Sequence, residues 1–353
     1  MATLYVVSLE SYAGKTAFCL GAGLELKARG AQVGYFKPLG TLPVEVGGVL
    51  TDEDVAFILR TLDIDEPPDQ ACPVLLTQSV IEEPLRGAAT DKSPLVRKAY
   101  EALSRRFPLL IMEGGASLAD GYSLGIPPSK LADMTDARVL LVIKYSRDLS
   151  SDEILMAKEA FGDRLAGAVV NSVPHEAMGF VKDTFPKFLH RNGLTFFGAL
   201  PADKLLMAIP VRELARLLNG EILSAADKQD ELVENFSIGA MNVDTALRYF
   251  LKTPNKAVIT GGDRADIQLA ALQTSTKCII LTGNLYPDAI ILGRAEELGV
   301  PMILVRSDTM ATVAAVEGSL GHIRLASAKQ IDRLAEMIRH EIDLRAIEKA
   351  LGT

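Results

Sequence analysis

The feature that most limits the fold of this chain is a series of short, largely apolar runs that alternate with helix-like stretches. Such runs are typical of strands buried on both faces, as in a parallel sheet covered by helices on each side. In the first part of the chain they lie at residues 4–9, 33–37, 108–113, 139–144, 166–171 and 194–200. Ligands of such sheets bind beyond the carboxyl ends of the strands, so the residues that follow each run are candidates for function.

A second, smaller α/β domain is expected after the first, since 353 residues exceed the usual length of one domain. From Pro201 the sequence becomes more charged and helical, and we place the boundary near residue 225, with domains of 1–225 and 226–353. The tail from Lys329 has the spacing of one or two amphipathic helices that could cover a sheet or a partner subunit. Between residue 225 and this tail, helix-like stretches alternate with apolar runs at residues 256–260, 277–282 and 301–305.

Composition narrows the class of partner. The net charge is −8, the pI is near 5.2 and there is no block of Lys and Arg, so we do not expect nucleic-acid binding. No apolar run reaches the roughly 18 residues of a membrane helix. The first strand starts almost at Met1, and we therefore expect a cytoplasmic protein without a signal peptide. The cysteines and histidines lie far apart, which indicates neither a disulfide framework nor a His/Cys metal site.

Gly14-Lys15-Thr16 joins a strand-like run to a helix-like run, which is the context of a phosphate loop. In such a loop, backbone N–H groups at the helix start bind the anion, the lysine neutralises phosphate oxygens and the threonine hydroxyl can bind Mg²⁺. The usual pattern has glycine five residues before Gly14, where this chain has Leu9. By itself the tripeptide is also compatible with an ordinary strand-to-helix turn.

Other polar residues follow the neighbouring strand-like runs. Lys37 ends the second run, where a solvated lysine would also fit. Asp52 and Asp54 precede a short helix; Asp52 suits a helix cap, and Asp54 is either a cap or a metal ligand. Glu113 ends a buried run, and a buried carboxylate needs a cation partner. Asn171 could contact a purine edge or cap a turn. Together these groups are the kinds of side chain that a site for MgATP and an anionic co-substrate needs.

The order of these residues resembles that of dethiobiotin synthetase and the wider cobyrinic acid a,c-diamide synthase class. The resemblance covers about residues 3–205 and rests on the stretches ESYAGKT, YFKPLG, DVAFI, MEGG, VVNSV and FGALP. That class has an altered loop before its GKT, which accounts for the missing glycine. The resemblance implies an α/β P-loop domain that binds ATP through Glu10, Ser11, Ala13, Gly14, Lys15 and Thr16.

The same resemblance implies further roles. Mg²⁺ would be surrounded by Thr16, Asp54 and Glu113. Lys15 and Lys37 would be catalytic, with Lys15 on the phosphates and Lys37, beside Thr41, on the carboxylate being activated. The adenine would contact Asn171. The loop at residues 114–130 does not match the biotin-pathway enzyme closely, which weakens the case for the same substrate.

The second half resembles the DRTGG domain in the stretches FSIGAMNVDTALRYF, NKAVITGGDRADIQLAAL, CIILTGN and GVPMILVRSDT. It has Ala265 where that family more often has threonine. Its turn could bind an unidentified small ligand, or Asp263 could cap the next helix while Arg264 forms a surface ion pair. The ligand-binding turn would comprise Gly261, Gly262, Asp263 and Arg264. Further candidates at loop positions are Asn242, Asn284 and Asp308.

This pair of domains resembles the N-terminal, regulatory part of long bacterial phosphotransacetylases, and the resemblance suggests a homodimer. Neither an acyltransferase domain nor the cysteine nucleophile of a glutaminase is found in the 353 residues, so neither activity is expected of this polypeptide by itself. Two functions are retained: an MgATP-binding protein that senses a small ligand, and an ATP-dependent ligase or amidase that activates a carboxylate. A structural module with a decayed nucleotide site is the third alternative.

Overall fold

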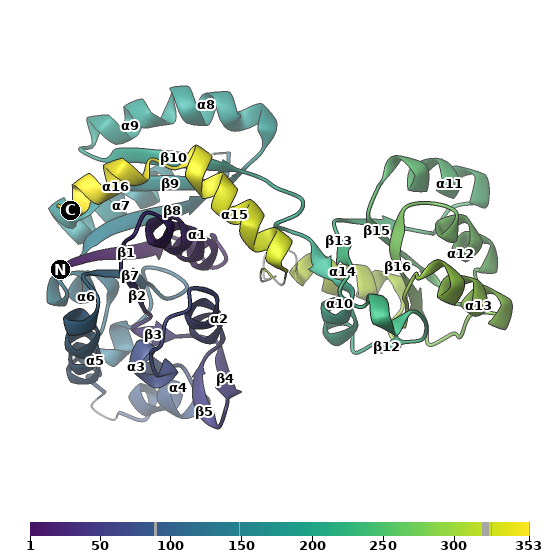
Figure 1. Ribbon diagram of the computed structural model, residues 1–353, viewed down its shortest axis with the longest axis horizontal. Helices are drawn as coiled ribbons and strands as arrows, with labels where there is room; N and C mark the ends of the chain where they lie inside the picture. The colour runs from purple at the N-terminus through teal and green to yellow at the C-terminus, as the bar shows by residue number, and fades with distance from the viewer. Residues whose placement is uncertain (88–89, 148, 320–324, 326, 353) are drawn as a thin grey trace. The chain divides into compact units, whose positions relative to one another are not determined.

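The computed structural model describes residues 1–87, 90–147, 149–319, 325 and 327–352. It divides into two compact units, one formed by Met1–Ala202 with Ile331–Thr353 and the other by Asp203–Gln330 (Figure 1). This division differs from the boundary expected near residue 225. The second unit begins earlier, and the C-terminal segment belongs to the first unit, because its apolar face packs there.

Among the described residues, the central sheet of the first unit has six strands in the order β10-β9-β8-β1-β7-β2, all parallel. The expected parallel α/β fold is therefore confirmed, and each of the six apolar runs is a strand. In chain order the strands are β1 (Ala2–Ser8), β2 (Val33–Phe36), β7 (Leu109–Glu113), β8 (Arg138–Lys144), β9 (Leu165–Val173) and β10 (Thr195–Pro201).

Helices cover both faces of this sheet. One face carries the helices from α5 to α9, whose apolar side chains share a core with Tyr5 and Val7 of β1. The opposite face carries α1, which contacts β1 and β7, and α16, which contacts β1 and β10. The helices are α1 (Lys15–Ala28), α2 (Glu53–Thr61), α3 (Pro68–Ala71), α4 (Gln78–Leu85), α5 (Ser93–Arg106), α6 (Pro128–Met134), α7 (Ser151–Phe161), α8 (Met178–Asp183), α9 (Phe185–Arg191), α15 (Ala328–Glu341) and α16 (Leu344–Leu351).

Short elements surround the end of β2. Two small sheets pair β3 with β6 and β4 with β5, and the second of these leads directly into α2. The short strands are β3 (Leu39–Gly40), β4 (Pro43–Val46), β5 (Val49–Asp52) and β6 (Val74–Leu75). Single 3₁₀ turns in the two units are η1 (Tyr122–Leu124), η2 (Gly162–Arg164), η3 (His175–Ala177) and η4 (Ala226–Lys228).

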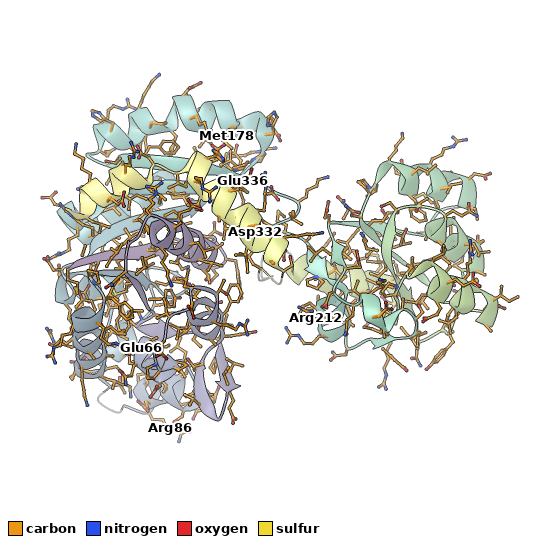
Figure 2. All side chains as sticks on the ribbon, viewed as in Figure 1. Glu66, Arg86, Met178, Arg212, Asp332 and Glu336 are labelled. Carbon is orange, nitrogen blue, oxygen red and sulfur yellow. The ribbon has the colours of Figure 1, made fainter. Side chains whose placement is uncertain are left out.

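Helix α15, the first of the two helices in the C-terminal segment, packs against α1. A side chain at Gly21 of α1 would lie 2.6 Å from Ile338, so the absence of one lets the two helices approach closely. Arg339 donates two hydrogen bonds, of 3.0 and 2.8 Å, to the buried carboxylate of Glu25 in α1. Asp332 and Glu336, labelled in Figure 2, lie one turn apart on the exposed side of α15. The amphipathic helix expected in the tail is thus a cover for the first unit.

The second unit is built on a sheet that, within the described residues, has five strands in the order β12-β17-β16-β15-β14. Of the strands described in this sheet, β12 alone runs antiparallel to its neighbour. Alternate residues of β15 face two different cores, Val258 on one side and Ile259 on the other, as expected for a sheet covered on both faces. The expected second α/β domain is confirmed.

The elements of the second unit follow the alternation expected from the sequence. Its strands are β11 (Ile209–Pro210), β12 (Glu221–Ile222), β13 (Leu232–Val233), β14 (Asn235–Ile238), β15 (Lys256–Gly261), β16 (Thr276–Thr282) and β17 (Met302–Leu304). Its helices are α10 (Val211–Leu217), α11 (Val243–Lys252), α12 (Ala265–Leu272), α13 (Ala289–Leu298) and α14 (Thr309–Ser319). Across the described part of the chain, no helix has both the length and the apolar character to cross a membrane.

Candidate functional site

The loop between β1 and α1 has the backbone form of an anion-binding loop. Gly14 lies at the N-cap of α1 in the left-handed region, with φ of 96°. A side chain there would lie 2.1 Å from the amide nitrogen of Asn171, so only glycine fits without displacing a neighbour. The helix therefore starts with its free N–H groups at the carboxyl edge of the sheet, where an anion can bind.

Lys15, the first residue of α1, has its side chain directed back over the loop. Its Nζ donates hydrogen bonds to Ser8 Oγ at 2.6 Å and to the Ala116 carbonyl at 3.4 Å. The residue is 7% exposed, and no carboxylate among the described residues lies within ion-pair distance of its amine. Burial lowers the pKa of Lys15, an effect that the negative charge of Glu113 opposes. Lys15 is a buried cation without an anion beside it.

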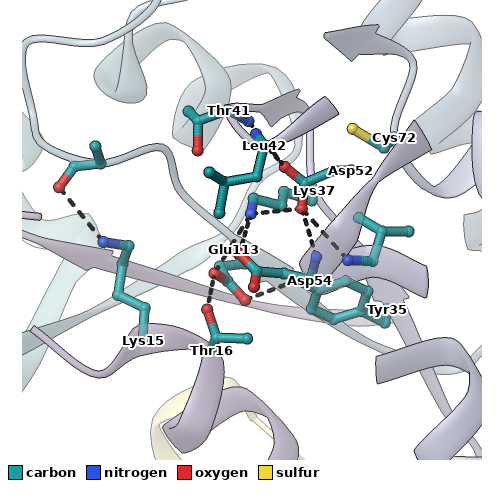
Figure 3. Close-up of polar contacts among 12 residues, drawn as sticks. Lys15, Thr16, Tyr35, Lys37, Thr41, Leu42, Asp52, Asp54, Cys72 and Glu113 are labelled. Atoms are coloured by element: carbon teal, nitrogen blue, oxygen red, sulfur yellow. Dashed lines mark hydrogen bonds and ion pairs between the residues drawn. The ribbon is translucent and has the colours of Figure 1, made fainter. Parts of the chain in front are cut away.

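Glu113, at the end of β7, is held by hydroxyl groups from two other elements. Thr16 Oγ1 donates to Glu113 Oε1 at 2.7 Å, and Tyr35 of β2 donates to Glu113 Oε2 at 2.7 Å. Both Tyr35 and Glu113 are buried. The carboxylate is thereby fixed directly beside the first turn of α1, as Figure 3 shows.

Lys37 directly follows β2 and lies among three carboxylates (Figure 3). Its Nζ is 2.8 Å from Asp52 Oδ1, 2.7 Å from Asp54 Oδ2 and 3.9 Å from Glu113 Oε1. The Lys37 side chain is 3% exposed. The solvated strand-end lysine considered from the sequence is therefore not what the structure contains.

Asp52 confirms the expectation of a helix cap and has a second role as well. Its Oδ1 accepts from the backbone N–H groups of Asp54 and Val55 in α2, and its Oδ2 accepts from those of Thr41 and Leu42. Four backbone donors hold this carboxylate in place, and it also pairs with Lys37.

The charges of these groups explain how they shift one another's pKa values. Burial favours neutral Lys37, but Glu113, Asp54 and Asp52 outweigh it and raise the pKa of Lys37 above the ordinary lysine value. Burial and the charge of Asp54 raise the pKa of Glu113, although Lys37 opposes this. Three carboxylates thus surround the single ammonium group of Lys37.

The donor set suits Mg²⁺. Thr16 offers a hydroxyl group, and Asp54 and Glu113 offer carboxylates, which are the hard oxygen ligands that this cation prefers. No cluster of three His, Cys, Asp or Glu side chains suited to a metal is found in the described ranges. That is compatible with Mg²⁺, which is commonly bound through one or two carboxylates together with substrate phosphates and waters.

Asn171, in β9, braces the loop. Its amide nitrogen donates to the Ala13 carbonyl at 2.9 Å, and its Oδ1 accepts from the backbone N–H of Ser172 at 2.9 Å. Contact with adenine stays a prediction. Of the remaining loop residues, Glu10 and Ser11 are exposed, and the Glu10 carbonyl accepts from Ser8 Oγ at 2.6 Å.

Sequence reasoning missed two residues of this site. Tyr35 precedes Lys37 by two residues, and residues two apart in a strand share a face, so the pattern could have indicated it. Ser8 ends β1 and holds Lys15, and its place as the last polar residue before the loop was a weaker signal.

In the second unit, the turn after β15 is tightly packed. A side chain at Gly262 would lie 1.7 Å from the Leu285 carbonyl, and Gln268 donates to the carbonyls of Gly261 and Gly262 at 3.1 and 3.0 Å. Arg264 forms an ion pair with Asp266 at 3.1 Å, as in the structural alternative from the sequence.

The helix cap that this alternative assigns to Asp263 is not present, and the loop candidates Asn242 and Asp308 cap helices instead. Helix α12 begins at Ala265 without a side-chain cap, so Asp263 does not cap it. Asn242 accepts from the Thr245 N–H at the start of α11, and Asp308 accepts from the Ala311 N–H in α14. Asn284 lies in the left-handed region, with φ of 56°. Ligand binding at this turn stays a prediction.

Two curated proteins are similar to all or part of this chain. The phosphate acetyltransferase of Pseudomonas aeruginosa is 25% identical over 380 aligned residues, which cover 100% of this chain and 52% of that protein. The ATP-dependent dethiobiotin synthetase BioD of Caldicellulosiruptor saccharolyticus is 28% identical over 126 residues, which cover 34% of this chain and 50% of that protein. This chain spans about half the length of the curated relatives it matches.

Among solved structures, the CBS and DRTGG domains of the regulatory region of Clostridium perfringens pyrophosphatase, complexed with the activator diadenosine tetraphosphate, align at 15% identity. The alignment covers 47% of this chain and 81% of that chain, with a TM-score of 0.30.

Family models match both units. A DRTGG domain matches residues 213–319. An AAA domain matches residues 2–209, which is more than half of the chain and includes the loop, Lys37 and Glu113. The chain therefore belongs to the AAA domain family, as a P-loop domain followed by a DRTGG domain that resembles part of phosphate acetyltransferases.

Proposed function

We propose that this protein binds MgATP at the loop before α1 and uses the bound nucleotide in a regulatory role, with the DRTGG domain as the sensor of a small ligand. The observation that carries the proposal is the buried amine of Lys15. It lies at the amino end of a helix, in contact with a hydroxyl and a carbonyl but with no carboxylate. A buried charge of this kind is stabilised by a counter-ion, and a phosphate would supply it.

Mg²⁺ would be held by Thr16, Asp54 and Glu113, and it would neutralise charge on the phosphate oxygens. Thr16 follows Lys15 directly, so both side chains belong to the first turn of α1. Tyr35 and Thr16 fix the orientation of Glu113. These residues bind and orient the nucleotide, and electrostatic positioning is most of what phosphoryl chemistry asks of a protein.

The regulatory role is supported by the order of the two domains. Phosphate acetyltransferases carry a similar stretch within a chain about twice as long. A protein that binds nucleotide in one unit and a ligand in another can act as a sensor if each ligand favours a different population of conformers. A homodimer and a cytoplasmic location stay predictions.

The proposal is tested by calorimetry and thermal unfolding with MgATP. A ligand present at one hundred times its Kd stabilises the folded state by about 2.7 kcal/mol, and wild type should show such a gain. Lys15→Met should lose it, because the methionine keeps the volume but not the charge. The matched control is Lys144→Met, which removes an exposed lysine at the end of β8. If Lys15→Met gains as much stability as wild type, the proposal fails.

The alternative function, carboxylate activation by a ligase or amidase, has less support. It needs Lys37 to meet an anionic substrate, whereas this lysine is already surrounded by three carboxylates. The small pocket beside Glu113 is lined by that residue, Asp120 and mainly apolar or glycine residues, with no lysine or arginine among its described lining. An anion would meet negative charge there. Release of ADP that depends on an added carboxylic acid would favour this alternative instead.

A further inference from the structure

We propose that Lys37 is an internal counter-ion that takes the place of a divalent cation, so that a metal binds at Asp54 and Glu113 only when the Lys37 amine moves away from them. The inference rests on the proposed function, since it concerns regulation of the same site. It assigns Lys37 a role different from the substrate contact that the resemblance implies.

The geometry places the amine among the residues that would bind the metal. Lys37 Nζ lies 2.7 Å from Asp54 Oδ2 and 3.9 Å from Glu113 Oε1. Glu113 Oε1 is also the atom that accepts from Thr16, so both carboxylates and the hydroxyl converge on one region that Lys37 already occupies. Figure 3 shows the amine between the carboxylates.

The electrostatics make the two cations exclude one another. Without metal, the buried carboxylates need a positive charge, and Lys37 supplies it with a side chain that is 3% exposed. Like charges a few ångströms apart repel one another strongly inside a protein, and a divalent cation repels an ammonium group more strongly than a second ammonium group would. A metal at Asp54 and Glu113 would therefore repel the Lys37 amine strongly if it stayed in place.

Asp52 gives the displaced amine a partner. Four backbone N–H groups fix its carboxylate, and it lies 2.8 Å from Lys37 Nζ without belonging to the candidate metal ligands. Lys37 can thus keep Asp52 while it gives up Asp54 and Glu113. The site is held closed to free metal until a nucleotide brings Mg²⁺ together with additional negative charge.

The test measures metal binding without nucleotide, using Mn²⁺ as the probe and the electron paramagnetic resonance of the free ion as the readout. Lys37→Gln retains an amide donor for Asp52 but loses the charge. It should bind one Mn²⁺ at least tenfold more tightly than wild type. Lys144→Gln should bind Mn²⁺ like wild type, and adding Glu113→Gln to Lys37→Gln should abolish the gain.

A folded Lys37→Gln protein that binds Mn²⁺ no more tightly than wild type overturns the inference. If Lys37→Gln does not fold, both it and Lys37→Met are examined by circular dichroism with and without Mn²⁺. Recovery of the fold on addition of Mn²⁺ supports the role of Lys37 as a substitute cation. If neither variant recovers its fold, that role is refuted. Binding of MgATP by wild type is measured separately. If it is present while Lys37→Gln shows no gain in Mn²⁺ affinity, only the counter-ion role is lost and the proposed function stands.

Discussion

Replacing Tyr35 by phenylalanine should destabilise the first unit, although it removes a single oxygen atom. The Tyr35 hydroxyl donates to Glu113 Oε2 at 2.7 Å, and the ring is 1% exposed. A hydrogen bond to a charged group contributes roughly 1.5–3 kcal/mol, and a buried carboxylate oxygen that loses its donor regains no water. Since phenylalanine fills the same space, packing is unchanged, and the free energy of unfolding should fall by about 1.5–3 kcal/mol.

Tyr5 provides a matched control in the same sheet. Its ring is 0% exposed, and its hydroxyl has no hydrogen-bond partner among the described residues. Burial, together with the charge of Asp120, raises the pKa of this hydroxyl beyond the ordinary tyrosine range. Because Tyr5→Phe removes an unsatisfied polar group, it should leave stability unchanged or raise it by up to about 1 kcal/mol.

Both variants are compared with wild type by urea unfolding, which is monitored with a probe in the first unit. The midpoint should fall for Tyr35→Phe and stay the same or rise for Tyr5→Phe, with the same dependence on urea concentration in both. If the two substitutions cost the same, the contribution assigned to the Tyr35–Glu113 hydrogen bond is refuted.

Two further predictions concern other parts of the chain. Arg339→Ala leaves the buried Glu25 carboxylate without its two-bond partner and should lower the free energy of unfolding. Arg294→Ala breaks an exposed pair and should lower it less, as measured by the midpoints of urea titrations. Burial lowers the pKa of Lys256 to about 8, so folded protein loses this proton before unfolded protein does. The stability of wild type relative to Lys256→Met should therefore rise by roughly 2 kcal/mol from about pH 8 toward 10.5; a constant difference in unfolding free energy across that range would contradict the reasoning.

The strands were predictable because their signal is local. Runs such as those of β1 and β8 are largely apolar, because a strand buried on both faces carries apolar side chains on each face. The short pair β4 and β5 was missed, since its residues are mostly exposed and show no such run. The unit boundary also differed, because an amphipathic helix such as α15 shows which face is buried but not against which partner.

The candidate site was predictable residue by residue, but not contact by contact. Polar groups that follow the strands of a parallel sheet lie at one edge of it. The sequence therefore predicted that Lys15, Lys37, Asp54 and Glu113 lie at the same edge. Lys37 is not the solvated strand-end lysine that the sequence also allowed, because it faces carboxylates of its own chain; its contact with a substrate stays a prediction. Asn171 was placed at the right edge, and its amide contacts the loop.

The sequence by itself determined the order of strands and helices, the loop with Gly14-Lys15-Thr16 and the identity of the charged groups that follow the strands, because these depend on residues close together in the chain. Only the tertiary structure decided which charges meet. Pairing of β2 with β7 aligns Phe36 with Met112 and so brings Lys37 beside Glu113, while the turn into α2 brings Asp52 and Asp54 to the same amine. Such pairings join distant segments, and their energy depends on burial, which no local pattern records.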